Sequence, residues 1–270
     1  RFRDVVFMPD GKSLLALTDE TGELEFARVP ANGVGTDEVL TSNGNILRFR
    51  GHPSPDGKWL AWDDNNRDLW VMNLATKETR RVSENREGIG SMTWSPDGRY
   101  IAFSSDREGN YEIYVMDVAG GAPRRLTTDP GMDTSPAWSP DGERIAFNSN
   151  RSGNWEIHVM RVDGSDVQQL TFHPAEYWRP AWSPDGQRLA FSSMRDGNWE
   201  IYVMAADGSG LQRLTDNPAM DWRAVWSPDG QRLAFISERD GNREVYVMRA
   251  DGSEQKRLTN DPGTDCGVDW

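Results

Sequence analysis

Ser139-Pro140-Asp141-Gly142 is the stretch that decides the fold, because it returns along the whole chain at a nearly constant interval. Proline presets φ at the first corner of a reverse turn, aspartate hydrogen-bonds forward to the backbone, and glycine tolerates a positive φ. The last four copies are 44 residues apart, and the two earlier intervals are 46 and 41 residues. Such a period indicates stacked units that cannot bury their apolar surface alone. The copies begin at Met8, Ser54, Ser95, Ser139, Ser183 and Ser227.

One complete unit contains four short strand signals separated by turns. The first turn joins a strand ending at Trp138 to a strand through Ile145-Ala-Phe147, and a second hairpin follows at 150–154. The third strand, Ile157–Met160, is apolar on nearly every residue, which indicates that both of its faces are covered. A fourth strand is expected around Gln169-Leu-Thr171. Six such units predict one all-β domain over residues 1–270, a six-bladed β-propeller of four-stranded antiparallel blades like those of WD40 repeats.

Composition narrows the possible partners. The formal charge of −13 argues against nucleic acid and anionic membrane surfaces as partners. No stretch approaches the roughly 18 apolar residues of a membrane-spanning helix, and the first residues lack the apolar core of a signal peptide. A single cysteine, Cys266, excludes an internal disulfide and a multi-cysteine metal site. We expect no cofactor, no membrane insertion and a monomer.

An aromatic residue precedes the turn in nearly every unit. We expect these side chains to fill the gaps between blades, so that truncation to alanine costs roughly 3–5 kcal/mol. The unit with Gly51-His52-Pro53 before its turn departs from the pattern. The residues are Phe7, Trp94, Trp138, Trp182, Trp226 and Trp270.

Units from about Gly90 to the end are close copies of one another. Trp138-Ser-Pro-Asp-Gly, the Ser-x-Arg-x-Gly pattern of 149–153, Asp163-Gly-Ser and Leu170-Thr occur in the same order in these units. In these motifs the chain resembles the repeat of TolB-type propellers over about two thirds of its length. The resemblance implies a non-catalytic, periplasmic adaptor of the cell envelope that docks a lipoprotein on its loop face. The N-terminal domain expected in that family is missing from the sequence, so the resemblance does not imply a role in translocation.

The first two units, residues 1–87, share the turns but not the detail of residues 88–270. Arg3-Asp-Val-Val-Phe-Met-Pro-Asp-Gly and Pro53-Ser-Pro-Asp-Gly-Lys-Trp-Leu-Ala are similar to the propeller of tricorn-type proteases. Two alternatives follow from this second resemblance. One is an engineered or recombined chimera with a joint near 84–90 and no selected function. The other is a substrate-gating propeller detached from a tricorn-like serine peptidase.

Catalytic chemistry finds little support in the sequence. Nucleophilic catalysis needs a base beside the nucleophile, and the chain has only His52, His158 and His173. His158 stands where other units have tyrosine, which favours a packing role. No Gly-x-Ser-x-Gly elbow is present. We therefore expect no enzymatic activity.

Most acids and several arginines recur at equivalent positions, which favours architectural roles. Arg107, Arg151, Arg195 and Arg239 are expected to form fixed ion pairs or backbone hydrogen bonds between blades. Three acids near the expected channel mouth are the only candidates for a calcium site, although they lack a compact Asp-x-Asp-x-Asp-Gly loop. These acids are Asp133, Asp221 and Asp265.

The positions where near-identical units disagree are the candidate binding site. Strand parity places the loop before the first strand and the hairpin between the second and third strands at the same end of each blade. Tryptophan, tyrosine and arginine on one surface are the composition of interaction hot spots, although the same rings could simply cover backbone. We expect a protein or peptide to bind this face or the central channel. The candidates are Tyr177, Trp178, Arg179, Trp222, Arg223, Tyr111, Trp155 and Trp199, with Arg243 at the equivalent position of the last unit.

Ring closure has three possible solutions. Both Arg3–Phe7 and Thr264–Trp270 align with the innermost strand of a unit, so the chain supplies seven such strands for six blades. Either one end frays, or one strand displaces the other, or the spare strand adds to another molecule.

Overall fold

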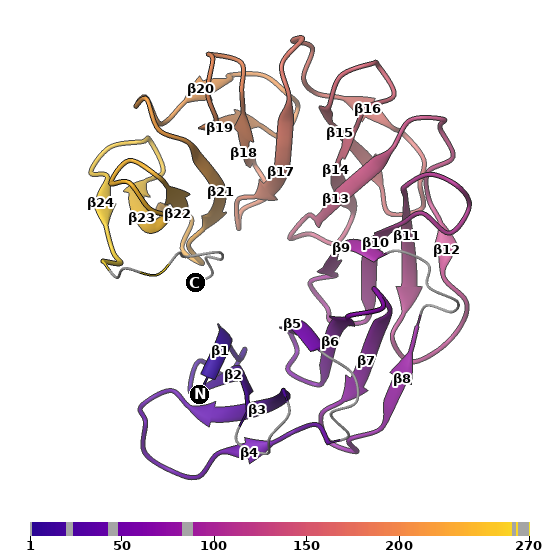
Figure 1. The fold of residues 1–270 in the computed structure, drawn as a ribbon. Helices are drawn as coiled ribbons and strands as arrows, with labels where there is room; N and C mark the ends of the chain where they lie inside the picture. Colours follow the sequence, from indigo (N-terminus) through magenta and orange to yellow (C-terminus); the bar gives the residue numbers. More distant parts are fainter. Residues whose placement is uncertain (1, 20–23, 43–47, 83–88, 261–262, 264–269) are drawn as a thin grey trace.

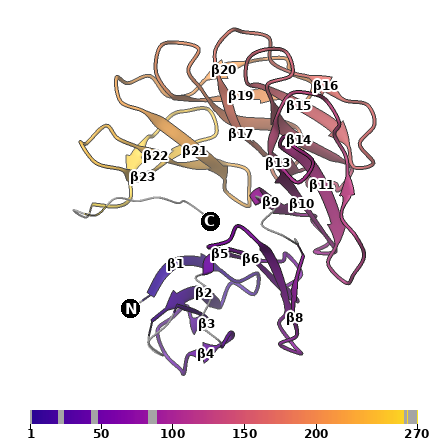
Figure 2. The same cartoon turned by 45° about the vertical axis from the view of Figure 1, so that its right-hand side comes forward.

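The computed structural model describes residues 2–19, 24–42, 48–82, 89–260, 263 and 270. These residues form six four-stranded antiparallel sheets, which follow one another around a ring (Figure 1). The view turned by 45° shows the same succession of blades (Figure 2). The predicted six-bladed propeller is therefore confirmed. The described residues form no helix with the length and hydropathy of a membrane span.

Within each blade the strands pair in sequence order. The first strand lies nearest the centre of the ring and the short fourth strand lies at the outer edge (Figure 1). Blades 1 to 3 consist of β1 (Phe2–Phe7), β2 (Ser13–Thr18), β3 (Glu25–Pro30), β4 (Glu38–Val39), β5 (Arg48–Pro53), β6 (Trp59–Asp64), β7 (Leu69–Asn73), β8 (Thr79–Arg81), β9 (Ile89–Trp94), β10 (Tyr100–Ser105), β11 (Glu112–Asp117) and β12 (Arg124–Arg125). Blades 4 to 6 consist of β13 (Asp133–Trp138), β14 (Arg144–Ser149), β15 (Glu156–Arg161), β16 (Gln168–Gln169), β17 (Tyr177–Trp182), β18 (Arg188–Ser193), β19 (Glu200–Ala205), β20 (Gln212–Arg213), β21 (Asp221–Trp226), β22 (Arg232–Ser237), β23 (Glu244–Arg249) and β24 (Lys256–Arg257).

The repeated turn has the geometry that its sequence predicts. Gly142 has φ +75°, a left-handed conformation that favours glycine. The Asp141 carboxylate accepts the N–H of Glu143 at 2.9 Å, and the Ser139 hydroxyl accepts the N–H of Arg144 at 2.9 Å. These acids thus serve the turn.

Tryptophans join the blades as expected. The Trp182 indole N–H donates to the Ala137 carbonyl of the preceding blade at 3.0 Å, and the Arg144 guanidinium lies over the same indole at 4.7 Å. Trp226 makes the equivalent bond to Ala181 at 3.1 Å. The prediction for Phe7 is wrong, because this side chain is 51% exposed and fills no gap between blades.

Five apolar clusters each join two consecutive blades, from blades 1 and 2 to blades 5 and 6. The continuous apolar third strands are buried on both faces in blades 3 to 5, as predicted. No such cluster of described residues joins blade 6 to blade 1. Accordingly, Leu258 of blade 6 is 55% exposed, whereas its counterparts in blades 3 to 5 are 6–8% exposed. These counterparts are Leu126, Leu170 and Leu214.

Both chain ends lie near this last blade interface (Figure 1). β1 pairs with β2 as the innermost strand of blade 1. The Trp270 indole donates to the Val225 carbonyl of blade 6 at 3.1 Å, which repeats the bond of Trp226 to Ala181. Trp270 therefore has the position of the tryptophan of a following blade. Residues 264–269, and with them the rest of the expected terminal strand, lie outside the described residues.

Candidate functional site

Three tryptophans and two arginines meet at one end of blades 5 and 6. Trp178 and Trp222 belong to the innermost strands β17 and β21, and Trp199 directly precedes β19. Together they line a cavity of about 290 Å³, which we call the tryptophan cavity. Its remaining lining residues are Arg179, Ser192 and Arg223. Five of the eight residues expected on the binding face therefore come together.

A β-bulge positions the two arginines. The register of β17 against β18 shifts between Trp178 and Ala181, and Arg179 within the bulge has φ +57°. The Arg179 N–H donates to the Asn148 side chain of the preceding blade at 2.8 Å. Arg223 has the same φ and donates its N–H to the Ser192 hydroxyl at 3.2 Å. The bulge thus fixes both residues through bonds to a neighbouring blade.

The bulge itself belongs to the blade architecture and not to the cavity alone. Ser135 of blade 4 has φ +52° at the equivalent position, and its N–H donates to the Ser91 hydroxyl of blade 3 at 2.9 Å. What distinguishes blades 5 and 6 is the arginine side chain carried at this point. The chemistry of the cavity therefore comes from substitutions on a backbone that the repeat supplies.

Stacked side chains extend the aromatic surface beyond the cavity. Trp155 of blade 4 packs against Trp178 with 4.7 Å between the ring centroids. The Arg243 guanidinium lies over Trp222 at 5.0 Å from the ring centroid. At the next blade interface, Trp199 and Trp222 occupy the positions of Trp155 and Trp178. Both Trp199 and Trp222 line the cavity.

Two of the expected residues lie elsewhere. Tyr111 is on blade 3, where its hydroxyl accepts from the Arg67 guanidinium, and it does not line the tryptophan cavity. The expectation that Tyr177 lies on the exposed face is wrong, because this side chain is 1% exposed and packs against Phe191 at 5.7 Å between ring centroids. Burial raises the pKa of Tyr177. Neighbouring residues of a strand point to opposite faces, so Trp178 is accessible while Tyr177 is in the core.

The calcium candidates are buried ion pairs in the described residues. Asp133 and Asp221 are both 0% exposed, and they pair with Arg151 at 2.8 Å and Arg239 at 2.9 Å. Burial raises the pKa of Asp133 despite the opposing effects of Ser149 and Arg151. The described residues contain no group of three or more metal-binding side chains. Asp265 lies outside the described residues.

Two of the four recurring arginines, Arg151 and Arg239, form ion pairs, but within their own blades and not between blades as predicted. Arg151 and Asp133 belong to blade 4, and Arg239 and Asp221 belong to blade 6. Each pair therefore fixes the hairpin between the second and third strands to the first strand of its own blade. In blade 5 Tyr177 replaces the acid.

His158 has the packing role that the sequence indicates. Its ring lies 5.6 Å from that of Phe147, and the side chain is 2% exposed. Burial lowers the pKa of His158 to about 4. A buried neutral imidazole in the core is not positioned to act on a substrate.

A buried network that was not predicted from the sequence repeats in blades 3, 5 and 6. In blade 5 the Thr215 hydroxyl and the Arg213 guanidinium both donate to the Glu200 carboxylate, the latter at 2.8 Å. Blade 4 keeps Glu156 but carries Gln169 at the position of the arginine, and burial raises the pKa of Glu156. The recurrence of Glu, Arg and Thr at fixed positions in the units was a signal for this network.

Comparison with known proteins identifies the family. A family model described as the TolB beta propeller domain (PD40) matches residues 39–180 and 176–268. The chain belongs to this family. The first match runs without a break across the expected boundary near residue 88, so it does not distinguish residues 39–87 from residues 88–180.

Individual relatives agree with this assignment. The Tol-Pal system protein TolB of Alcanivorax borkumensis is 33% identical over 91 residues, which are 32% of this chain and 20% of that protein. A structure described as TolB from Agrobacterium tumefaciens has a TM-score of 0.70 at 28% identity, covering 83% of this chain and 84% of that one. An oligogalacturonate lyase in complex with manganese shares the fold, with a TM-score of 0.77 at 20% identity over 93% of this chain and 74% of that one.

Proposed function

We propose that the chain is a non-catalytic propeller that binds a protein or peptide through the tryptophan cavity and the stacked side chains around it. The observation that carries this proposal is the meeting of Trp178, Trp199 and Trp222 with Arg179 and Arg223 around one cavity of about 290 Å³. Tryptophan and arginine are the residues most enriched among interaction hot spots. The guanidinium groups of the two arginines are planar donors suited to carboxylates and backbone carbonyls.

The family supports a proposal for the partner. The Alcanivorax borkumensis relative is named as a component of the Tol-Pal system. We infer a periplasmic adaptor whose partner is a lipoprotein of the Pal type, bound by a monomer of this chain. The oligogalacturonate lyase among the structural neighbours is only 20% identical, a level at which the likeness supports the fold alone. The chimeric and peptidase-gate alternatives have no specific observation in their favour.

The test uses the double variant Trp178→Ala with Trp222→Ala. Both side chains are only partly buried, so we expect the melting temperature to change little. The probe is purified Pal of the Alcanivorax borkumensis Tol-Pal system, and binding is measured by calorimetry. We expect affinity to fall at least about tenfold, the effect of losing one hot-spot side chain.

Trp226→Phe serves as the matched control, because Trp226 is a buried tryptophan at a blade interface and not part of the cavity. It should lower the melting temperature while leaving affinity for Pal unchanged. Unaltered affinity in the double variant, above all together with a large drop in its melting temperature, would refute a binding role for the cavity. Lack of binding by the unaltered protein would refute Pal as the partner.

A further inference from the structure

The residue at one equivalent position of the fourth strand contacts the next blade at four of the five described blade interfaces. Charged or amide side chains make these contacts with side chains or carbonyl groups of the next blade's turn. The contacts are Glu38 with Lys77 at 2.7 Å, Arg80 with the Val118 carbonyl at 3.1 Å, Arg124 with the Val162 and Asp163 carbonyls at 3.0 and 2.9 Å, and Gln212 with the Asp251 carbonyl at 3.5 Å.

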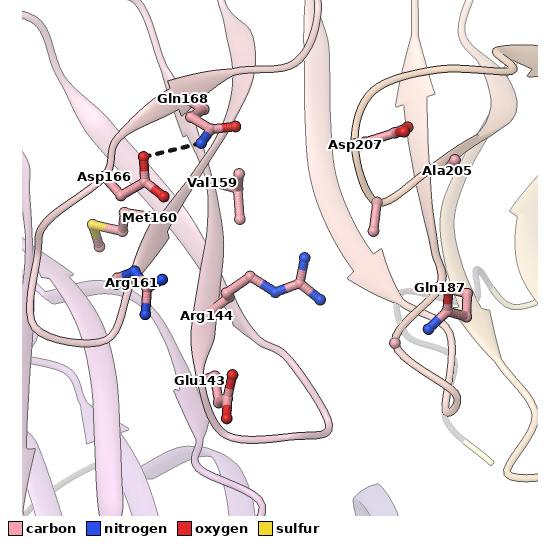
Figure 3. A pocket seen from close by; sticks show the side chains of 12 residues that line it. Glu143, Arg144, Val159, Met160, Arg161, Asp166, Gln168, Gln187, Ala205 and Asp207 are labelled. Atoms are coloured by element: carbon pink, nitrogen blue, oxygen red, sulfur yellow. Dashed lines mark hydrogen bonds between the residues drawn. The ribbon is translucent and has the colours of Figure 1, made fainter.

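The interface between blades 4 and 5 is the exception. Gln168 occupies the position of Arg124, but its amide donates to the Asp166 carboxylate of its own blade at 3.0 Å (Figure 3). The carbonyls equivalent to those bound by Arg124 are those of Ala206 and Asp207. In the described part of the chain neither of these two carbonyls accepts a hydrogen bond. The contact that arginine makes at blades 3 and 4 is therefore missing here.

A cavity of about 410 Å³ lies at this point. Gln168, Ala206 and Asp207 line it, together with Glu143 and Asp166. A cavity of about 370 Å³ is also present between blades 3 and 4, but Arg124 lines that one and binds the two carbonyls across it. The two cavities thus differ in whether a guanidinium of the chain itself bridges the blades.

Charge favours a cation in the larger cavity. Three carboxylates line it, those of Glu143, Asp166 and Asp207, together with the Arg161 guanidinium. Hydrogen bonds from the hydroxyl and N–H of Ser209 lower the pKa of Asp207. Arg144 also lines the cavity and extends between the two blades (Figure 3). Its guanidinium lies over the Trp182 indole at 4.7 Å and pairs with Asp141 at 3.6 Å. The acids that line the cavity thus outnumber its arginines by three to two.

We propose that this cavity binds a guanidinium group, supplied by an arginine side chain on the surface of another protein. The group donates to the carbonyls of Ala206 and Asp207 as Arg124 does to those of Val162 and Asp163, and nearby carboxylates balance its charge. The cavity lies at the turns after the first and third strands, which is the opposite end of the blades from the tryptophan cavity. The proposal is therefore independent of the function proposed above.

The test uses N-acetyl-argininamide as the probe and Gln168→Arg as the variant. In this variant the arginine of the chain reaches the carbonyls itself, so the melting temperature should rise and affinity for the probe should fall at least about tenfold. N-acetyl-lysinamide should bind the unaltered protein more weakly, because an ammonium group lacks the planar pair of donors.

Asp166→Asn provides a second variant, since asparagine tolerates the left-handed φ of +54° at this position. It removes one carboxylate without adding a competing guanidinium, and affinity should fall severalfold. Gln212→Arg, at the next blade interface, should leave affinity unchanged. Equal affinity of Gln168→Arg and the unaltered protein, equal binding of the two probes, or no binding of N-acetyl-argininamide would each overturn the proposal.

Discussion

The buried ion pair of blade 4 allows a quantitative prediction for Arg151→Met. Methionine retains much of the apolar stem of Arg151 and removes the guanidinium that lies 2.8 Å from the Asp133 carboxylate. Asp133 is 0% exposed, so the variant leaves a buried charge without its cationic partner. Breaking a buried pair in this way costs about 3–5 kcal/mol of unfolding free energy. For a chain of this size the melting temperature should fall by roughly 6–20 °C.

The pH dependence of this loss identifies its cause. Burial already raises the pKa of Asp133, and removal of Arg151 raises it further. A carboxyl with a raised folded-state pKa is most favourable when protonated, so stability is greatest below the unfolded pKa of about 3.9 and falls as pH rises through the folded pKa. The difference between variant and unaltered protein should therefore shrink on acidification. Urea unfolding followed by tryptophan fluorescence from pH 4 to 8 measures it.

Blade 5 offers the matched control. Arg195 occupies the position of Arg151, but Tyr177 replaces the acid there, so Arg195→Met leaves no buried carboxylate at that position. Its cost should be clearly smaller and nearly independent of pH. Arg151→Met combined with Asp133→Asn should recover part of the loss. A loss below about 1 kcal/mol for Arg151→Met, the value typical of exposed pairs, or equal losses in blades 4 and 5, would refute the reasoning.

Two further substitutions test the packing and the buried network. Gln169→Arg should give Glu156 the ion pair that its counterparts have and stabilise the protein by about 1–3 kcal/mol in urea unfolding. Because the pKa of Glu156 is raised, this gain should grow as pH rises through that pKa. Arg213→Gln should have the reverse effect in the same assay. Trp226→Ala should lower the free energy of unfolding by roughly 3–5 kcal/mol. Phe7→Ala should change the denaturation midpoint little, because the Phe7 side chain is 51% exposed. Equal effects of the two substitutions would contradict the packing described for the blade interfaces.

Features with a local cause that recurs in each unit were predictable from the sequence. The φ of Gly142 and the hydrogen bonds of Asp141 depend on four adjacent residues. The bond from Trp182 to the preceding blade follows from a large indole before each turn. The location of Trp178 and Trp199 at the same end of the blade follows from the antiparallel order of the strands alone. The loop before the first strand and the hairpin between the second and third strands lie at that end. Because the units repeat, each of these features recurs at equivalent positions of the same chain.

Features that depend on tertiary context were not predictable. Tyr177 and Trp178 are adjacent and both aromatic, yet only the first is in the core. The sequence does not show which face of the strand is exposed at the bulge, because a register shift of one residue turns each side chain to the opposite face of the sheet. The burial of Asp133 depends likewise on an arginine 18 residues away. The direction of Gln168 depends on a competing acceptor in its own blade.

Differences between near-identical blades divide into those that the structure compensates and those that it does not. Tyr177 replaces a buried aspartate and fills the space with an aromatic ring, so the change is compensated within the core. Gln168 and Gln169 both stand where other blades have arginine, and Gln169 keeps only the hydrogen bond to the carbonyl of the following threonine, here Thr171 at 2.6 Å. Among the described residues, the first leaves two carbonyls without a donor, and the second leaves Glu156 without the arginine that its counterparts have. Neither change stabilises the fold. Blades 4 and 5 are therefore the part of the ring in which we expect a second binding site, apart from the tryptophan cavity.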